Sequence, residues 1–120
     1  MSLSADSMRV RFRPAVEKTF SVTMARKVGG EMRAIIITGA GADPTAELDI
    51  TSSPEMSSVR MANNGSTRSV NVHSLRITES SNIPVNSEIR DLSIPARHHL
   101  AISVTDWAAV NLTAEARAPE

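Results

Sequence analysis

The chain has 120 residues, the length of one ordinary domain, and its 41% apolar and 22% charged residues are typical of a globular protein, not of a disordered or fibrous one. It has no cysteine, which excludes disulfides, thiolate chemistry and every metal site that needs sulfur ligands. Because 13 acidic residues balance 13 basic ones, no net field draws the chain to nucleic acid or to an anionic membrane.

The two ends of the sequence set the expected domain boundaries. Residues 1–7, which begin Met1-Ser2-Leu3, are typical of a leader or flexible arm. The abrupt end at Glu120 leads us to expect a single domain, 1–120, taken from a larger protein. No apolar run approaches the roughly 20 residues that cross a bilayer, so we expect no membrane insertion. The compartment stays open, and an extracytoplasmic one is compatible with the absence of thiols.

Alternation of apolar and polar residues, the period of strands buried on one face, begins near the N-terminus. Residues 8–13 alternate three apolar residues with three arginines, and Pro14 ends that strand. Residues 19–28 alternate again and lead into Gly29-Gly30. This glycine pair predicts a two-residue hairpin turn, because glycine adopts positive φ at both central positions without cost.

The glycine turn predicts a register for its hairpin. The expected opposite pairs are Val28 and Glu31, Arg26 and Arg33, Met24 and Ile35, and Val22 and Ile37. The like charges of Arg26 and Arg33 then lie side by side, so we expect the hairpin tip to project past the core. Residues 35–37 are apolar on both faces, which predicts a central strand covered on both sides.

The second half of the chain contains another turn signal and a change of phase. Asn64-Gly65 predicts a hairpin in which Val59 pairs with Val70 and Ser57 with Val72. Apolar positions then change from even to odd numbers, which indicates a β-bulge near His73-Ser74. Residues 79–97 are less regular, and residues 100–105 and 110–115 alternate as two closing strands.

Short alternating runs joined by turns, with no helical period between them, predict an all-β fold. We expect one antiparallel β-sandwich of about seven to nine strands, immunoglobulin-like or fibronectin-like, with a jelly roll as the alternative. The expected core residues are Val22, Met24, Ile35, Ile37, Leu48, Ile50, Val70, Val72, Leu100, Ile102, Val104, Val110 and Leu112.

No catalytic motif or metal site emerges from the sequence. The adjacent His98 and His99 point to opposite faces of a strand, so they cannot both bind one ion without a local turn. Serines lack a nucleophile-elbow context, and residues 39–42 lack the Gly-Lys-Ser/Thr of a phosphate loop. The carboxylates of Asp43, Glu47 and Asp49 could supply oxygen ligands for calcium, but their spacing matches no EF-hand. We therefore expect no enzyme, no metal and no cofactor.

Two surfaces are candidates for binding. Arg9, Arg11 and Arg13 form a basic stripe that could meet an acidic partner, although charges on an edge strand also prevent aggregation. The chain lacks the aromatic residues that stack on nucleic-acid bases, so no nucleic acid is expected. The second surface is a strand-end cluster formed by His98, His99, Asp106 and Trp107.

The leading hypothesis is a non-catalytic accessory, interaction or spacer module of a larger, exported bacterial protein. Its partner would be another protein or a neighbouring domain of the same chain. Two alternatives stay open. One is a self-assembling structural subunit, such as a phage or capsid component, which would be a homo-oligomer. The other is a carbohydrate-binding module that uses Trp107.

Overall fold

The computed structural model describes residues 7–41, 46–65, 68–79, 87–106 and 111–117, with side chains for all of them except Ser87, Asp106 and 111–117. Over these residues the chain forms nine strands and no helix. The strands are β1 (Met8–Phe12), β2 (Thr19–Val28), β3 (Glu31–Ala40), β4 (Leu48–Ser52), β5 (Ser58–Asn63), β6 (Val70–Glu79), β7 (Ser87–Ile94), β8 (His99–Asp106) and β9 (Asn111–Arg117).

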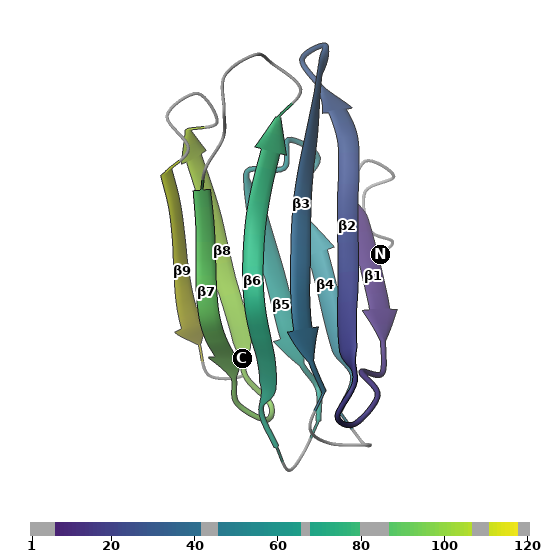
Figure 1. The fold of residues 1–120 in the computed structure, drawn as a ribbon. Coiled ribbons are helices and arrows are strands. Elements are labelled where there is room, and N and C mark those ends of the chain that lie inside the picture. Colours follow the sequence, from purple (N-terminus) through teal and green to yellow (C-terminus); the bar gives the residue numbers. More distant parts are fainter. Residues whose placement is uncertain (1–6, 42–45, 66–67, 80–86, 107–110, 118–120) are drawn as a thin grey trace, which may run out of the picture.

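The strands form two antiparallel sheets packed face to face (Figure 1). One sheet has five strands in the order β1-β4-β5-β8-β9, and the other has four in the order β2-β3-β6-β7. This confirms the predicted antiparallel β-sandwich. The strand orders are not the ABED and CFG orders of a constant-type immunoglobulin domain, so the topology lends no support to the immunoglobulin label.

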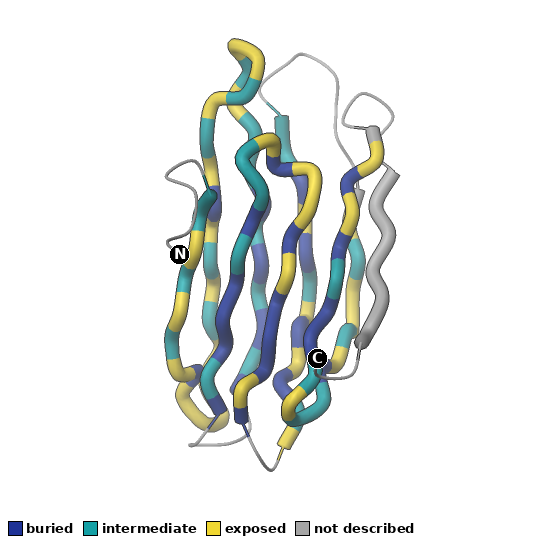
Figure 2. Tube along the Cα trace, turned by 180° about the vertical axis from the view of Figure 1, so that it is seen from behind, coloured by how far each residue is buried: buried dark blue, intermediate teal, exposed yellow. Residues whose placement is uncertain are grey.

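The core lies between the sheets, and buried and exposed residues alternate along most strands (Figure 2). Ten of the thirteen expected core residues are buried, namely Met24, Ile35, Ile37, Leu48, Ile50, Val70, Val72, Leu100, Ile102 and Val104. Val22 is only half-buried, because β2 is an outer strand with a neighbour on one side alone. Val110 and the side chain of Leu112 lie outside the described part of the chain.

The hairpin at Gly29-Gly30 is confirmed together with its register. The two glycines have φ angles of 61° and 84°, and β2 pairs with β3 from Val28 opposite Glu31 onward. The tip extends beyond the rest of the sandwich (Figure 2). Arg26 and Arg33 are half-buried nonetheless, and Arg33 Nε lies 3.7 Å from Glu79 Oε1. A carboxylate of β6 therefore offsets the like charges that the register brings together.

The predicted β-bulge is confirmed in the pairing of β3 with β6. Thr38 lies opposite Ser74 and Gly39 opposite Val72, so His73 is the extra residue. The prediction that residues 35–37 are covered on both sides is wrong. Ile36 faces away from the other sheet and is only half-buried, so β3 is central in its sheet and open on its outer face.

The predicted hairpin at Asn64-Gly65 is wrong. Strands β5 and β6 lie in different sheets, and the residues between them cross from one sheet to the other. Val59 pairs with Ser52 and Ile102, whereas Val70 pairs with Ile94.

Asn63 holds this crossing in place from a fully buried position. Its Nδ2 donates hydrogen bonds of 2.9 Å to the carbonyls of Arg68 and Ile94, and its Oδ1 accepts one of 2.9 Å from the Gly65 amide. Gly65 does not have a positive φ, so glycine is needed there because a larger residue would not fit. A Cβ there would lie 2.8 Å from the Cα of Ala46.

Candidate functional site

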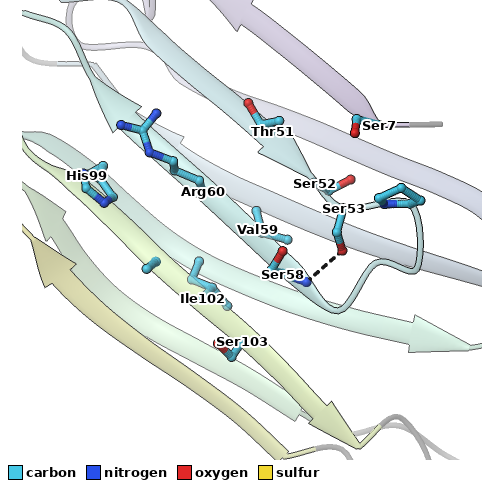
Figure 3. Close-up of a pocket in the computed structure, with 12 residues that line it drawn as sticks. Ser7, Thr51, Ser52, Ser53, Ser58, Val59, Arg60, His99, Ile102 and Ser103 are labelled. Carbon is cyan, nitrogen blue, oxygen red and sulfur yellow. Dashed lines mark hydrogen bonds between the residues drawn. The ribbon is translucent and has the colours of Figure 1, made fainter. Parts of the chain in front are cut away.

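The outer face of the five-stranded sheet carries an open depression with a volume of about 690 Å³ (Figure 3). Strands β4, β5 and β8 supply most of its lining. Six hydroxyl residues, one arginine and one histidine give it a polar character. These are Ser7, Thr51, Ser52, Ser53, Ser58, Ser103, Arg60 and His99.

Strand alternation and register explain why these residues meet. Val59 and Ile102 point into the core, so Ser58, Arg60, Ala101 and Ser103 point outward from the same two strands. Ser58 lies opposite Ser103, and Arg60 lies opposite Ala101. Short side chains at the centre leave the backbone within reach of another molecule.

Arg60 and His99 lie at the same end of the depression, and the serines Ser58 and Ser103 lie toward the other end (Figure 3). Arg60 is exposed and carries a guanidinium cation. His99 is only 5% exposed although it belongs to the outer face. The depression therefore has one cationic end and one hydroxyl-lined end.

The predicted basic stripe is largely paired with acidic residues. Arg9 donates from Nε and NH2 to the two carboxylate oxygens of Asp49, at 3.0 and 2.7 Å. Arg11 donates from the same two nitrogens to Glu47 Oε1, at 3.2 and 2.6 Å. Arg13 is exposed. Strand β1 is an outer strand paired with β4, so the stripe lies along an edge of the five-stranded sheet.

These contacts shift ionisation in the directions that their charges require. The hydrogen bonds and the charge of Asp49 raise the pKa of Arg9. The hydrogen bonds from Arg11, followed by its charge, lower the pKa of Glu47. Glu47 and Asp49 thus neutralise arginines, and Asp43, the third carboxylate of the calcium hypothesis, lies outside the described residues.

The strand-end cluster is brought together only in part. His99 lines the depression, whereas His98 lies in the connection before β8, where its Nδ1 is 2.8 Å from the carbonyl oxygen of Ala96. Asp106 ends β8, but its side chain is outside the described part of the chain. Trp107 lies wholly outside it.

In the depression, Ser58 and Ser103 do not lie within hydrogen-bond distance of the His99 imidazole. His99 and Ser103 are four residues apart on one strand, a separation of about 13 Å at 3.3 to 3.4 Å per residue, and Ser58 lies opposite Ser103. Within the described residues, no group of three or more histidine, aspartate or glutamate side chains could hold a metal ion. No helix of the described chain is long and apolar enough to span a membrane.

Among the polar lining residues, the sequence interpretation named His99 alone and missed Ser7, Thr51, Ser52, Ser53, Ser58, Arg60 and Ser103. Strands β4 and β5 follow each other along the chain, but β8 begins 36 residues after the end of β5, so a local pattern does not show that they lie side by side. The sequence signal for this depression was the run of small residues at outward positions of β8.

A second depression of about 270 Å³ lies on the other sheet, beside the bulged His73 and Asp91, which has a φ of 57°.

Comparison with protein-family models, with curated proteins and with solved structures finds no match to this chain.

Proposed function

We propose that this chain is a non-catalytic interaction module, and that it contacts an acidic protein surface through the outer face of the five-stranded sheet. The partner belongs to another protein or to a neighbouring domain of the same chain. The observation that carries this proposal is the polar depression over β4, β5 and β8, with Arg60 at its cationic end.

The lining supports surface contact better than chemistry. Its central side chains are short, so a partner strand or loop can approach the backbone closely. Hydroxyl groups can donate and accept hydrogen bonds in any orientation, which suits recognition of a polar surface. The separation of His99 from Ser58 and Ser103 leaves no nucleophile and base within hydrogen-bond reach of each other in this depression.

The charge of Arg60 allows a direct test. We expect Arg60→Glu to abolish retention of the partner when the purified domain is used as bait in an extract of its source cells, with bound proteins quantified by mass spectrometry. The retained protein is then purified and its affinity measured by calorimetry. Its dissociation constant should rise at least about tenfold for Arg60→Glu, and should rise with salt for the wild type.

The matched control is Arg76→Glu, the same reversal on β6 at the outer face of the other sheet. Both arginines are exposed, and both strands are central in their sheets. A partner lost from Arg60→Glu but kept by Arg76→Glu supports the proposal. Equal retention by wild type and both variants would overturn it, as would a substrate turned over by the wild type.

A further inference from the structure

The four outer strands of the two sheets differ in how well they resist pairing with another chain. Strand β1 has five residues and carries Arg9 and Arg11, with Pro14 soon after it. Strand β7 contains Asp91, whose φ of 57° is irregular for a strand. Strand β9 is described by its backbone alone. Strand β2 has ten residues and contains neither a proline nor a positive-φ residue.

The free side of β2 is a template for another strand. It pairs with β3 along all ten residues, so it is regular, and no described strand pairs with its other side. From residue 19 to residue 25 it has no charged side chain. Native proteins usually protect long regular edges with charges, prolines or bulges, and β2 has none of these in that stretch.

We propose that β2 pairs with β2 of a second copy of this chain, antiparallel, about a two-fold axis perpendicular to the sheet. The two four-stranded sheets then become one continuous sheet of eight strands across the dimer. Such a contact is isologous and closed, so it gives a dimer and not a fibre.

Symmetry and side-chain type select a register for this pairing. A perpendicular axis keeps each side chain on its own face of the sheet, so an inward residue must lie opposite an inward residue. Centring the axis on Val22 places Val22 opposite its own copy and Phe20 opposite Met24. Over Phe20, Val22 and Met24 the inward row of both copies is then apolar. A centre shifted to Thr23 would place Phe20 opposite Arg26 instead.

The monomer leaves the inward row of β2 incompletely covered. Phe20 and Val22 are half-buried, although Met24 in the same row is fully buried. Phe20 already packs edge-on against Phe12 of β1, with ring centroids 5.1 Å apart, so this side of the sandwich presents apolar side chains from both sheets. A second copy would bury Val22, which the alternation of residues 19–28 predicts to be a core residue.

The register also ends cleanly at the start of β2. Strand β2 begins at Thr19, which falls opposite Ala25, so Glu17 and Lys18 lie outside the paired stretch. On the outward face Ser21 falls opposite Thr23, and both side chains are exposed.

The pair of Ser21 and Thr23 allows a charge-swap test of both the dimer and its register. Sedimentation equilibrium of the wild type, from micromolar to millimolar protein, should give twice the chain mass of 12.9 kDa. Ser21→Lys with Thr23→Lys places lysines directly opposite each other twice. The dimer dissociation constant should rise about tenfold or more.

Two further proteins separate the register from a general effect of charge. Ser21→Glu with Thr23→Lys places opposite charges against each other, so the dimer should persist. The double-lysine variant mixed with Ser21→Glu, Thr23→Glu should form a mixed dimer. Ser93→Lys, an exposed position on β7, should leave the dimer unchanged. Circular dichroism and thermal unfolding establish that each variant is folded.

Three results would overturn this proposal. The first is a wild type that is monomeric over the whole concentration range, which would leave the β2 edge to a strand of some other protein. The second is a dimer that the double-lysine variant does not weaken, because its interface would then lie elsewhere. The third is equal weakening by the double-lysine and the Glu-Lys variants, because the proposed register would then be wrong.

Discussion

Asp49 lies in the middle of an outer face yet keeps only 8% of its surface exposed, and both its carboxylate oxygens accept hydrogen bonds from Arg9. We expect Arg9→Ser to lower the free energy of unfolding more than Arg13→Ser, because only the first leaves a nearly buried carboxylate without these donors. Urea denaturation of the two variants measures the difference. Adding Asp49→Asn to Arg9→Ser should recover part of the loss, and equal losses for the two serine variants would contradict the expectation.

Glu47 gives the domain a predictable response to acid. Its pKa in the folded protein lies below its ordinary value of 4.5, chiefly because Arg11 donates hydrogen bonds to it. A lowered folded pKa contributes stability that is present above the unfolded pKa and is lost as pH falls through the folded one. The stability difference between wild type and Glu47→Gln should therefore be constant near neutral pH and shrink below about pH 4.5. Denaturation at several pH values measures it, with exposed Glu55→Gln as the control; a difference that grows in acid would refute this assignment.

At the scale of elements, the crossing from β5 to β6 depends on the amide of Asn63. Its NH2 group faces two carbonyl oxygens, so Asn63→Asp would place a carboxylate oxygen against them without changing the size of the side chain. We expect a loss of about 2 kcal/mol or more in the free energy of unfolding. Asn64→Asp, at the exposed neighbour, should cost less than about 0.5 kcal/mol. Similar losses for the two variants, measured by chemical denaturation, would remove Asn63 from this role.

The hairpins show which elements a local pattern can predict. Gly29-Gly30 has open space around both glycines, so only the backbone decides its structure, and the two-residue turn follows from positive φ. At Asn64-Gly65 the same kind of signal misleads. A buried side chain, Asn63, takes up the local hydrogen bonds and directs the chain into the other sheet. That choice depends on Ile94, which lies 31 residues away along the chain.

On the scale of the whole molecule, stability depends on the apolar layer between the sheets. Ile102 is 1% exposed in β8, and its neighbour Ser103 faces solvent. Ile102→Ala should lower the free energy of unfolding by about 2 to 5 kcal/mol, and Ser103→Ala by less than about 0.5 kcal/mol. Thermal and urea unfolding of both variants test this. A loss below about 0.5 kcal/mol for Ile102→Ala would place that face of β8 outside the core.

The sequence by itself determined the features that depend on interactions between residues close together along the chain. A period of two fixes which residues of a strand face the core, glycine at positive φ makes a hairpin, and the phase change near His73 locates a bulge. Tertiary structure decided the rest, because strand order in a sandwich is a long-range outcome. The partners of Arg9 and Arg11 lie 40 and 36 residues away, and the depression needs β4, β5 and β8 side by side. Val22 has the pattern of a core residue, yet on the outer strand β2 it is half-buried, whereas Met24 of the same strand is buried.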